Sequence, residues 1–208
     1  MERSKDKIGY IIIIVTYLVG VFGFRLEASK ELFLLMVPFH LLLVFGIILW
    51  LHKTWDSRFV AFLILCYSIS FASEYIGVHT GLLFGDYLYG TVLGLKLADV
   101  PLIIGINWVM LIYLAFAISE KLSFSTWLTV FIGAVILTVL DFIMEPGAIR
   151  LGFWNWTHGD IPVFNYICWF GLSLLLLVIA KLLKIKAELN ISLVIIFCQV
   201  LFFFALRF

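Results

Sequence analysis

The sequence predicts an all-α polytopic membrane protein, with about seven transmembrane helices in one bundle and re-entrant or capping loops on the outer side. Hydrophobic residues make up 64% of the 208-residue chain and charged residues only 13%, whereas about a quarter of a soluble domain is charged. Apolar stretches long enough to cross a bilayer, about 20 residues each, occur seven times. No linker, low-complexity tract or convincing repeat separates them, so we expect residues 1–208 to form a single transmembrane domain.

Each predicted helix follows from one apolar stretch. A polar segment precedes the first stretch without a small-residue cleavage site, which favours an uncleaved span over a signal peptide. His40 is the one polar side chain near the centre of the second, and we interpret it as a core histidine. Pro101, a favoured first-turn residue, precedes the fourth, and the seventh is barely long enough to span. The stretches lie at about 8–24, 32–51, 59–80, 101–119, 125–144, 163–183 and 190–206.

The charges of the loops predict the orientation. With the N-terminus inside, the inner segments hold nine lysines and arginines and the outer segments hold five. Cytoplasmic loops of membrane proteins carry the excess of these residues, so we expect the N-terminus inside. The third and fifth helices then end on the same outer side, each followed by an unusual loop.

The first unusual stretch runs from Ser73 to Tyr89 and places Glu74, His79 and Asp86 among aromatic residues. A carboxylate in lipid costs several kcal/mol unless it is paired, protonated or facing a cavity. Glycines at positions 77, 81 and 85 fit either a close helix–helix contact or a loop that folds back onto protein. Residues 81–100 are too apolar for an exposed loop, which favours a folded-back cap.

The second unusual stretch runs from Asp141 to Asn165. Asp141 and Glu145 are four residues apart and share one helical face, where two like charges in a low dielectric do not both ionise easily. Arg150 is the nearest candidate for an ion-pair partner. Trp154 and Trp156 fit an interfacial aromatic belt or aromatic faces that stabilise a cation.

Several chemistries are excluded by what the sequence lacks. The four histidines have no metal-ligand spacing, and no nucleotide-binding or nucleophile-elbow motif occurs. The seventh predicted helix has no lysine for a retinal Schiff base, and a net charge of +1 argues against nucleic acid as a partner. Acid–base chemistry remains, in which a buried neutral carboxylic acid protonates an electron-rich alkene. This chemistry needs no metal and no cofactor.

Five motifs resemble the carotenoid hydratase family, which includes the 1′,2′-hydratases and the bisanhydrobacterioruberin hydratase. They are E-Y-I-G-V-H-T-G-L-L-F-G-D-Y-L-Y at 74–89, L-G-L-K-L-A-D-V-P at 93–101, Asp141 with Glu145-Pro146, G-F-W-N-W at 152–156 and I-P-V-F-N-Y at 161–166. The resemblance covers about residues 60–175. It implies a membrane enzyme that adds water to the terminal isopropylidene double bond of an acyclic carotenoid end, giving a tertiary alcohol.

The resemblance also implies partners and a location. Lycopene, γ-carotene or a C50 precursor would present the same end group to the site, together with water. Membrane lipid and other carotenoid enzymes are further expected partners, and the cytoplasmic membrane of a prokaryote is the expected location.

We assign site residues on the chemistry of their side chains. Glu74, Asp141 and Glu145 form the predicted acid–base group, with Asp86 positioning water; which of them donates the proton stays open. We expect their carboxyl groups to converge under a lid made by residues 81–100 and 147–162. The predicted substrate-binding residues are Tyr75, His79, Phe84, Tyr87, Asn107, Trp108, Trp154, Trp156 and Asn165.

Two alternative functions fit the same residues. A membrane lycopene-type cyclase would begin with the same protonation, but an internal alkene would capture the cation. A carotenoid carrier or an ion-coupled transporter would use the intramembrane carboxylates as a proton relay. Transporters commonly show unusual helices in both halves of the chain, whereas here they cluster in one central block.

Overall fold

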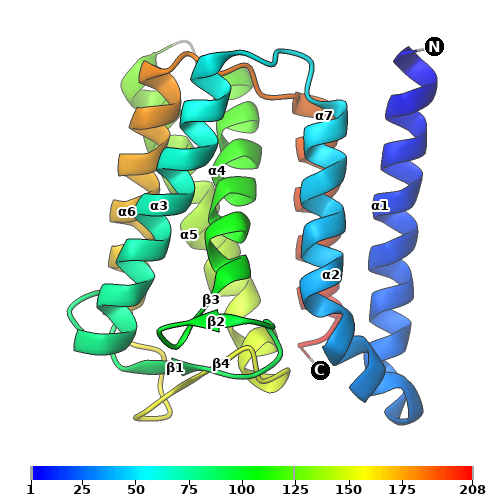
Figure 1. Cartoon of the computed structure of the whole chain (residues 1–208), viewed down its shortest axis with the longest axis vertical. Helices are drawn as coiled ribbons and strands as arrows, with labels where there is room; N and C mark the ends of the chain where they lie inside the picture. The colour runs from blue at the N-terminus through cyan, green and yellow to red at the C-terminus, as the bar shows by residue number, and fades with distance from the viewer. Residues whose placement is uncertain (1, 124, 208) are drawn as a thin grey trace.

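The computed structural model describes residues 2–123 and 125–207, where seven helices run up and down between two ends of the molecule (Figure 1). Met1, Phe124 and Phe208 of the predicted domain lie outside the described residues. Six helices are long and apolar enough to cross a membrane, and the 17-residue α7 is shorter. The predicted all-α polytopic bundle is confirmed. The helices are α1 (Glu2–Arg25), α2 (Glu27–Leu51), α3 (Ser57–Thr80), α4 (Leu102–Leu122), α5 (Thr126–Arg150), α6 (Val163–Leu182) and α7 (Leu189–Ala205).

The predicted bounds of three helices were wrong. α2 begins at Glu27 rather than near residue 32. α1 begins at Glu2, so the polar segment before the first apolar stretch is helical. α5 continues past Pro146 to Arg150, although proline removes one helical hydrogen bond. Membrane helices tolerate this where neighbouring groups satisfy the freed backbone. Asp141 and Glu145 therefore lie within α5, and the loop that follows begins at Leu151 rather than at residue 147.

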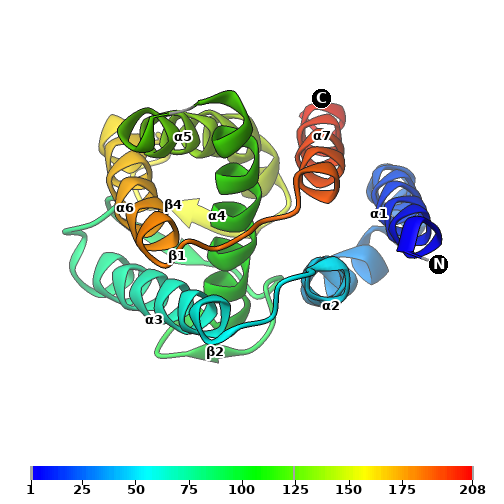
Figure 2. The same cartoon turned by 90° about the horizontal axis from the view of Figure 1, so that it is seen from above.

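α4 is the central helix. Most of its residues are buried, including Trp108, Tyr113 and Phe116. It packs against α2, α3, α5, α6 and α7. Viewed from above, α3, α4, α5 and α6 form one group of helices, and α1, α2 and α7 lie beyond α4 (Figure 2).

A cap of two short β-ribbons covers the end of the bundle where α3 and α5 finish (Figure 1). β1 (Tyr87–Tyr89) pairs antiparallel with β4 (Trp154–Trp156), and β2 (Lys96–Leu97) pairs with β3 (Val100–Pro101). The Gly90 amide donates to the Phe153 carbonyl at 2.9 Å, which extends the β1–β4 ladder. The two segments expected to form a lid thus meet as one hydrogen-bonded cap.

The glycines at the end of α3 allow this cap to fold back. A Cβ on Gly77 would lie 3.0 Å from the Leu83 carbonyl oxygen and 3.0 Å from the Tyr87 hydroxyl. Gly81 ends α3 in the left-handed region, with a φ of 65°, where glycine is least strained. The folded-back interpretation of these glycines is confirmed, because the atoms that they approach belong to the cap.

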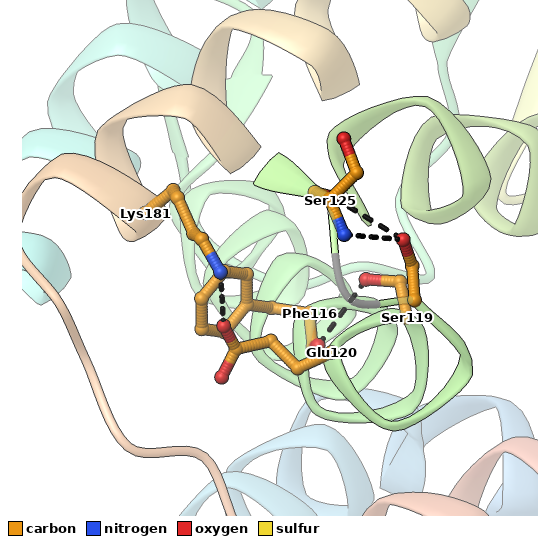
Figure 3. Close-up of polar contacts among 6 residues, drawn as sticks. Phe116, Ser119, Glu120, Ser125 and Lys181 are labelled. Carbon is orange, nitrogen blue, oxygen red and sulfur yellow. Dashed lines mark hydrogen bonds and ion pairs between the residues drawn. The ribbon is translucent and has the colours of Figure 1, made fainter. Parts of the chain in front are cut away.

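Polar contacts join the helices at the opposite end of the bundle. Figure 3 shows the Lys181 ammonium of α6 donating to the Glu120 carboxylate of α4. Lys53, after α2, pairs with Glu188, before α7, at 3.8 Å. The N-terminus lies at this end, away from the cap (Figure 1). The side of the membrane on which each end lies stays a prediction.

We predict that Gly81→Ala destabilises the protein by about 1–2 kcal/mol, because alanine is strained in the left-handed region. The new Cβ would also lie 2.4 Å from the Asp86 carboxylate. Thermal unfolding in detergent should show a lower midpoint than the wild type. Gly46→Ala is the matched control, because its Cβ meets no atom within 4 Å and alanine favours a helix. An equal loss in both variants would contradict the cap's dependence on Gly81.

Candidate active site

Glu74 lies two turns before the end of α3 and is 4% exposed. Its carboxylate accepts three hydrogen bonds, all from aromatic side chains. The Tyr87 hydroxyl and the Tyr89 hydroxyl (2.7 Å) donate to one oxygen, and the Trp108 indole donates to the other at 2.8 Å. A buried carboxylate is thus held by neutral donors from the cap and from α4.

Tyr87 and Tyr89 reach the same carboxylate because they occupy alternate positions of a strand. Side chains two apart in a strand point to the same face, and β1 presents this face to α3. Burial, with the nearby Glu74 carboxyl group, raises the pKa of both hydroxyl groups. Both tyrosines therefore remain protonated donors.

Asp141 and Glu145 form the second cluster, on one face of α5. The Glu145 carboxylate accepts from the Trp154 indole at 3.0 Å and the Trp156 indole at 3.2 Å. The Asn165 amide of α6 donates to Asp141 at 2.8 Å and to Glu145 at 3.3 Å. Both carboxyl groups are 1% exposed or less. The Asp141 Oδ1 atom is buried and has no hydrogen-bond partner among the described residues.

Among residues 2–123 and 125–207, no positively charged side chain forms an ion pair with these carboxyl groups. None of the described ion pairs includes Glu74, Asp141 or Glu145. Arg150, the expected candidate partner, donates instead to the Leu206 carbonyl at 3.4 Å. In the same residues, no group of three histidines, cysteines or acidic residues is arranged to hold a metal ion.

Glu74 and Glu145, one from each cluster, line one narrow cavity of about 30 Å³ beneath the cap. Trp108 and Trp169 form part of its wall, with ring centroids 4.2 Å apart. A volume of about 10–15 Å³ is enough for one water molecule, so the cavity has room for water beside the carboxylates. It is lined by Glu74, Phe84, Tyr87, Tyr89, Ile104, Asn107, Trp108, Met144, Glu145, Trp154, Trp156, Asn165 and Trp169.

Most of the predicted site residues therefore come together. Asp141 does not line the cavity, but the Asn165 amide, which does, donates to both acidic residues of α5. The predicted residues that line the cavity are Glu74, Phe84, Tyr87, Asn107, Trp108, Glu145, Trp154, Trp156 and Asn165.

Three predicted residues lie elsewhere. The Asp86 side chain is 62% exposed and lies 3.5 Å from His158. Tyr75 is 44% exposed and stacks on His79 outside the cavity, with ring centroids 4.3 Å apart. Tyr75 and His79 lie on the outer face of α3, whereas Glu74 points inward. The structure therefore does not bring Asp86, Tyr75 or His79 to the carboxylates.

Four lining residues were missed from the sequence: Tyr89, Ile104, Met144 and Trp169. Two of them, Tyr89 and Trp169, had a signal in the sequence. Tyr89 is two residues after Tyr87, and a predicted strand there would have placed both on one face. Trp169 follows Asn165 by four residues and so shares its helical face. Tyr89 could have been found only if the strand had been predicted. Trp169 could have been found only if Asn165 had been recognised as a contact of the acidic pair.

Comparison with known proteins identifies the family. The family model described as "Carotenoid biosynthesis protein" matches residues 32–207. The chain belongs to this family. The bisanhydrobacterioruberin hydratase of Haloarcula japonica is 29% identical over 105 residues, which are 48% of this chain and 35% of that relative. The matched part thus spans about a third of the relative's length. No solved structure matches the chain.

Membership of the carotenoid biosynthesis family confirms the resemblance seen in the five motifs. The matched range runs from within α2 to Arg207, two residues after the end of α7, so it includes both carboxylate clusters and the cap.

We predict that Tyr89→Phe destabilises the protein by about 1–3 kcal/mol, because a buried oxygen of the Glu74 carboxyl group loses one of its donors. The readout is the thermal midpoint in detergent. Tyr75→Phe is the matched control on α3, since this tyrosine is 44% exposed and lies outside the cavity. Equal stability of the two variants would show that the bond to Glu74 contributes nothing.

Proposed function

We propose that this protein is a carotenoid-modifying enzyme that adds water to the terminal isopropylidene double bond of an acyclic carotenoid end, without a cofactor. The observation that carries the proposal is the pair of carboxylate clusters around one aromatic cavity that lacks a described cation. The printed name of the Haloarcula japonica relative, a hydratase, supports the same reaction class.

The acidic pair of α5 is the proposed proton donor. Two buried carboxylates one turn apart do not both ionise easily, so the pair holds one proton that belongs to both groups. The unpartnered Asp141 Oδ1 suits a protonated carboxyl group. Glu145 lines the cavity and delivers this proton to the less substituted alkene carbon. The π electrons form the new C–H bond and leave a tertiary carbocation.

Glu74 is the proposed base on the other helix. Its three donors stabilise a negative charge, which together with the indole faces of the cavity stabilises the carbocation. Water then forms the C–O bond, and Glu74 accepts the proton that the water releases. Return of that proton to the acidic pair completes a cycle in which one water molecule is added.

The size and polarity of the cavity favour hydration over cyclisation. About 30 Å³ of space, next to Asn107 and Asn165, can hold a water molecule with polar partners. A cyclase would need the same space for an internal alkene of the substrate. Cyclisation leaves the mass of the substrate unchanged, so the product mass separates the two reactions.

The orientation is proposed on the loop charges. The positive-inside rule places the N-terminal end of the bundle in the cytoplasm and the cap on the outer side of a prokaryotic cytoplasmic membrane. Lycopene, γ-carotene or a C50 precursor then reaches the site from the bilayer.

We predict that cells which accumulate lycopene or γ-carotene form a product heavier by one water when they express this protein. Glu74→Gln, Asp141→Asn and Glu145→Gln should each lower its formation at least ~10²-fold, because each removes a proton-transfer group. Pigment extracts are analysed by mass spectrometry and normalised to the amount of membrane-inserted protein.

Asp99→Asn is the matched control, since its side chain is 77% exposed on the cap, and it should hydrate as the wild type does. Absence of the heavier product from each of these carotenoids would contradict the proposal. A cyclised product of unchanged mass would indicate the cyclase, and bound but unaltered pigment would indicate the carrier.

A further inference from the structure

A second and larger cavity lies beside the carboxylate cavity. It is an apolar groove of about 390 Å³, formed by α1, α2 and α7 on one side and by α4, α5 and the cap on the other. Aromatic side chains make much of its wall. Phe24 contacts both Phe33 and Phe202 edge-on, with ring centroids 5.8 and 5.9 Å apart. We refer to it below as the apolar groove.

The apolar groove and the carboxylate cavity adjoin each other. Four residues line both of them: Ile104, Asn107, Met144 and Trp154. One of these, Trp154, also donates to Glu145. A molecule in the groove would therefore place its end against these shared residues, next to the carboxylate cavity.

The rim of the apolar groove faces the surroundings of the bundle. Its lining includes half-exposed side chains of two neighbouring helices, among them Val19 of α1 (50% exposed) and Met36 of α2 (42% exposed). Both helices are apolar enough to span a membrane, so this rim faces lipid. A hydrophobic molecule dissolved in the bilayer can enter there without crossing water.

We propose that the apolar groove binds the long hydrocarbon chain of the substrate and presents its terminal double bond to the carboxylate cavity. This inference rests on the proposed function, and it adds the chain-binding site and the class of occupant, a linear polyene. An apolar, aromatic wall matches such a chain, and burial of its surface supplies binding free energy in proportion to the area covered. The narrow carboxylate cavity admits the end group alone.

Two consequences follow for the choice of substrate. A short isoprenoid presents the same end group to the carboxylate cavity but covers little of the apolar groove, so it loses most of the binding free energy. Variants that fill the groove should harm the long substrate and spare the short one.

The experiment uses adjacent residues as matched pairs. Val19→Trp and Met36→Trp add bulk at the groove rim, whereas Leu18→Trp (54% exposed) and Leu35→Trp (68% exposed) add it beside the rim on the same helices. Each variant is purified in detergent from cells that accumulate lycopene, and the pigment retained per protein is read from its visible absorbance. Conversion is then compared for lycopene and for a short acyclic isoprenoid hydrocarbon with the same terminal isopropylidene group.

We expect the two rim variants to retain about tenfold less lycopene, since tenfold corresponds to about 1.4 kcal/mol of lost contact, and to convert less of it. Their conversion of the short isoprenoid should equal that of the wild type, and the Leu18 and Leu35 variants should behave as the wild type in both assays. Equal pigment retention by all four variants would overturn the apolar groove as the chain site. An equal loss of conversion of the short and the long substrate would overturn it as well.

Failure of the proposed function gives a different pattern. Retained pigment that is never hydrated by the wild type would contradict the hydratase, while the matched pairs would still report on the groove. Glu74→Gln separates the two further, because it should retain pigment in the groove without converting it.

Discussion

The carboxyl groups of Glu74, Asp141 and Glu145 are buried in an apolar bundle, and no described cation pairs with them. The rest of the structure depends on how these groups are stabilised. Neutral donors from aromatic side chains and one asparagine take the place of a cation. The cap supplies four of these donors, and the β1–β4 register couples them, because it sets Tyr87 opposite Trp156 and Tyr89 opposite Trp154. The tyrosines that bind Glu74 thus contact the tryptophans that bind Glu145, with ring centroids 5.4 and 6.3 Å apart. One short ribbon holds both clusters to the same cavity.

α4 lies between the carboxylate cavity and the apolar groove. Its Trp108 donates to Glu74 and stacks on Trp169, while its Ile104 and Asn107 line both the carboxylate cavity and the apolar groove. The polar site therefore lies at the end of an apolar path. Such an arrangement lets the proposed enzyme take a water-insoluble substrate from the bilayer and expose only its terminal double bond to acid.

The helices and the buried acidic residues could be predicted from the sequence, because a long apolar stretch and a carboxylate within it are local signals. Glu74, Asp141 and Glu145 were recognised in this way, and the glycines at 77, 81 and 85 indicated the folded-back cap. The residues that were wrongly predicted to lie at the cavity show the limit of such local signals. Tyr75 and His79 neighbour Glu74 in sequence but lie on the outer face of α3, and Asp86 points away from the cavity to His158. Their positions depend on the rotation of α3 and on the β1–β4 pairing, which joins residues 65 to 69 positions apart. Neither can be predicted from a short stretch of sequence.

The central claim is that the buried carboxyl groups protonate the terminal alkene of a carotenoid and that water captures the cation. Conversion of lycopene by the purified protein in D₂O tests it most directly. We predict an alcohol that carries one carbon-bound deuterium on the carbon next to the tertiary C–O carbon, as seen by mass spectrometry and NMR after the hydroxyl deuterium has been exchanged out. An oxygenated product without that carbon-bound deuterium would contradict the account, because its oxygen would have arrived by a route that does not begin with protonation of the alkene.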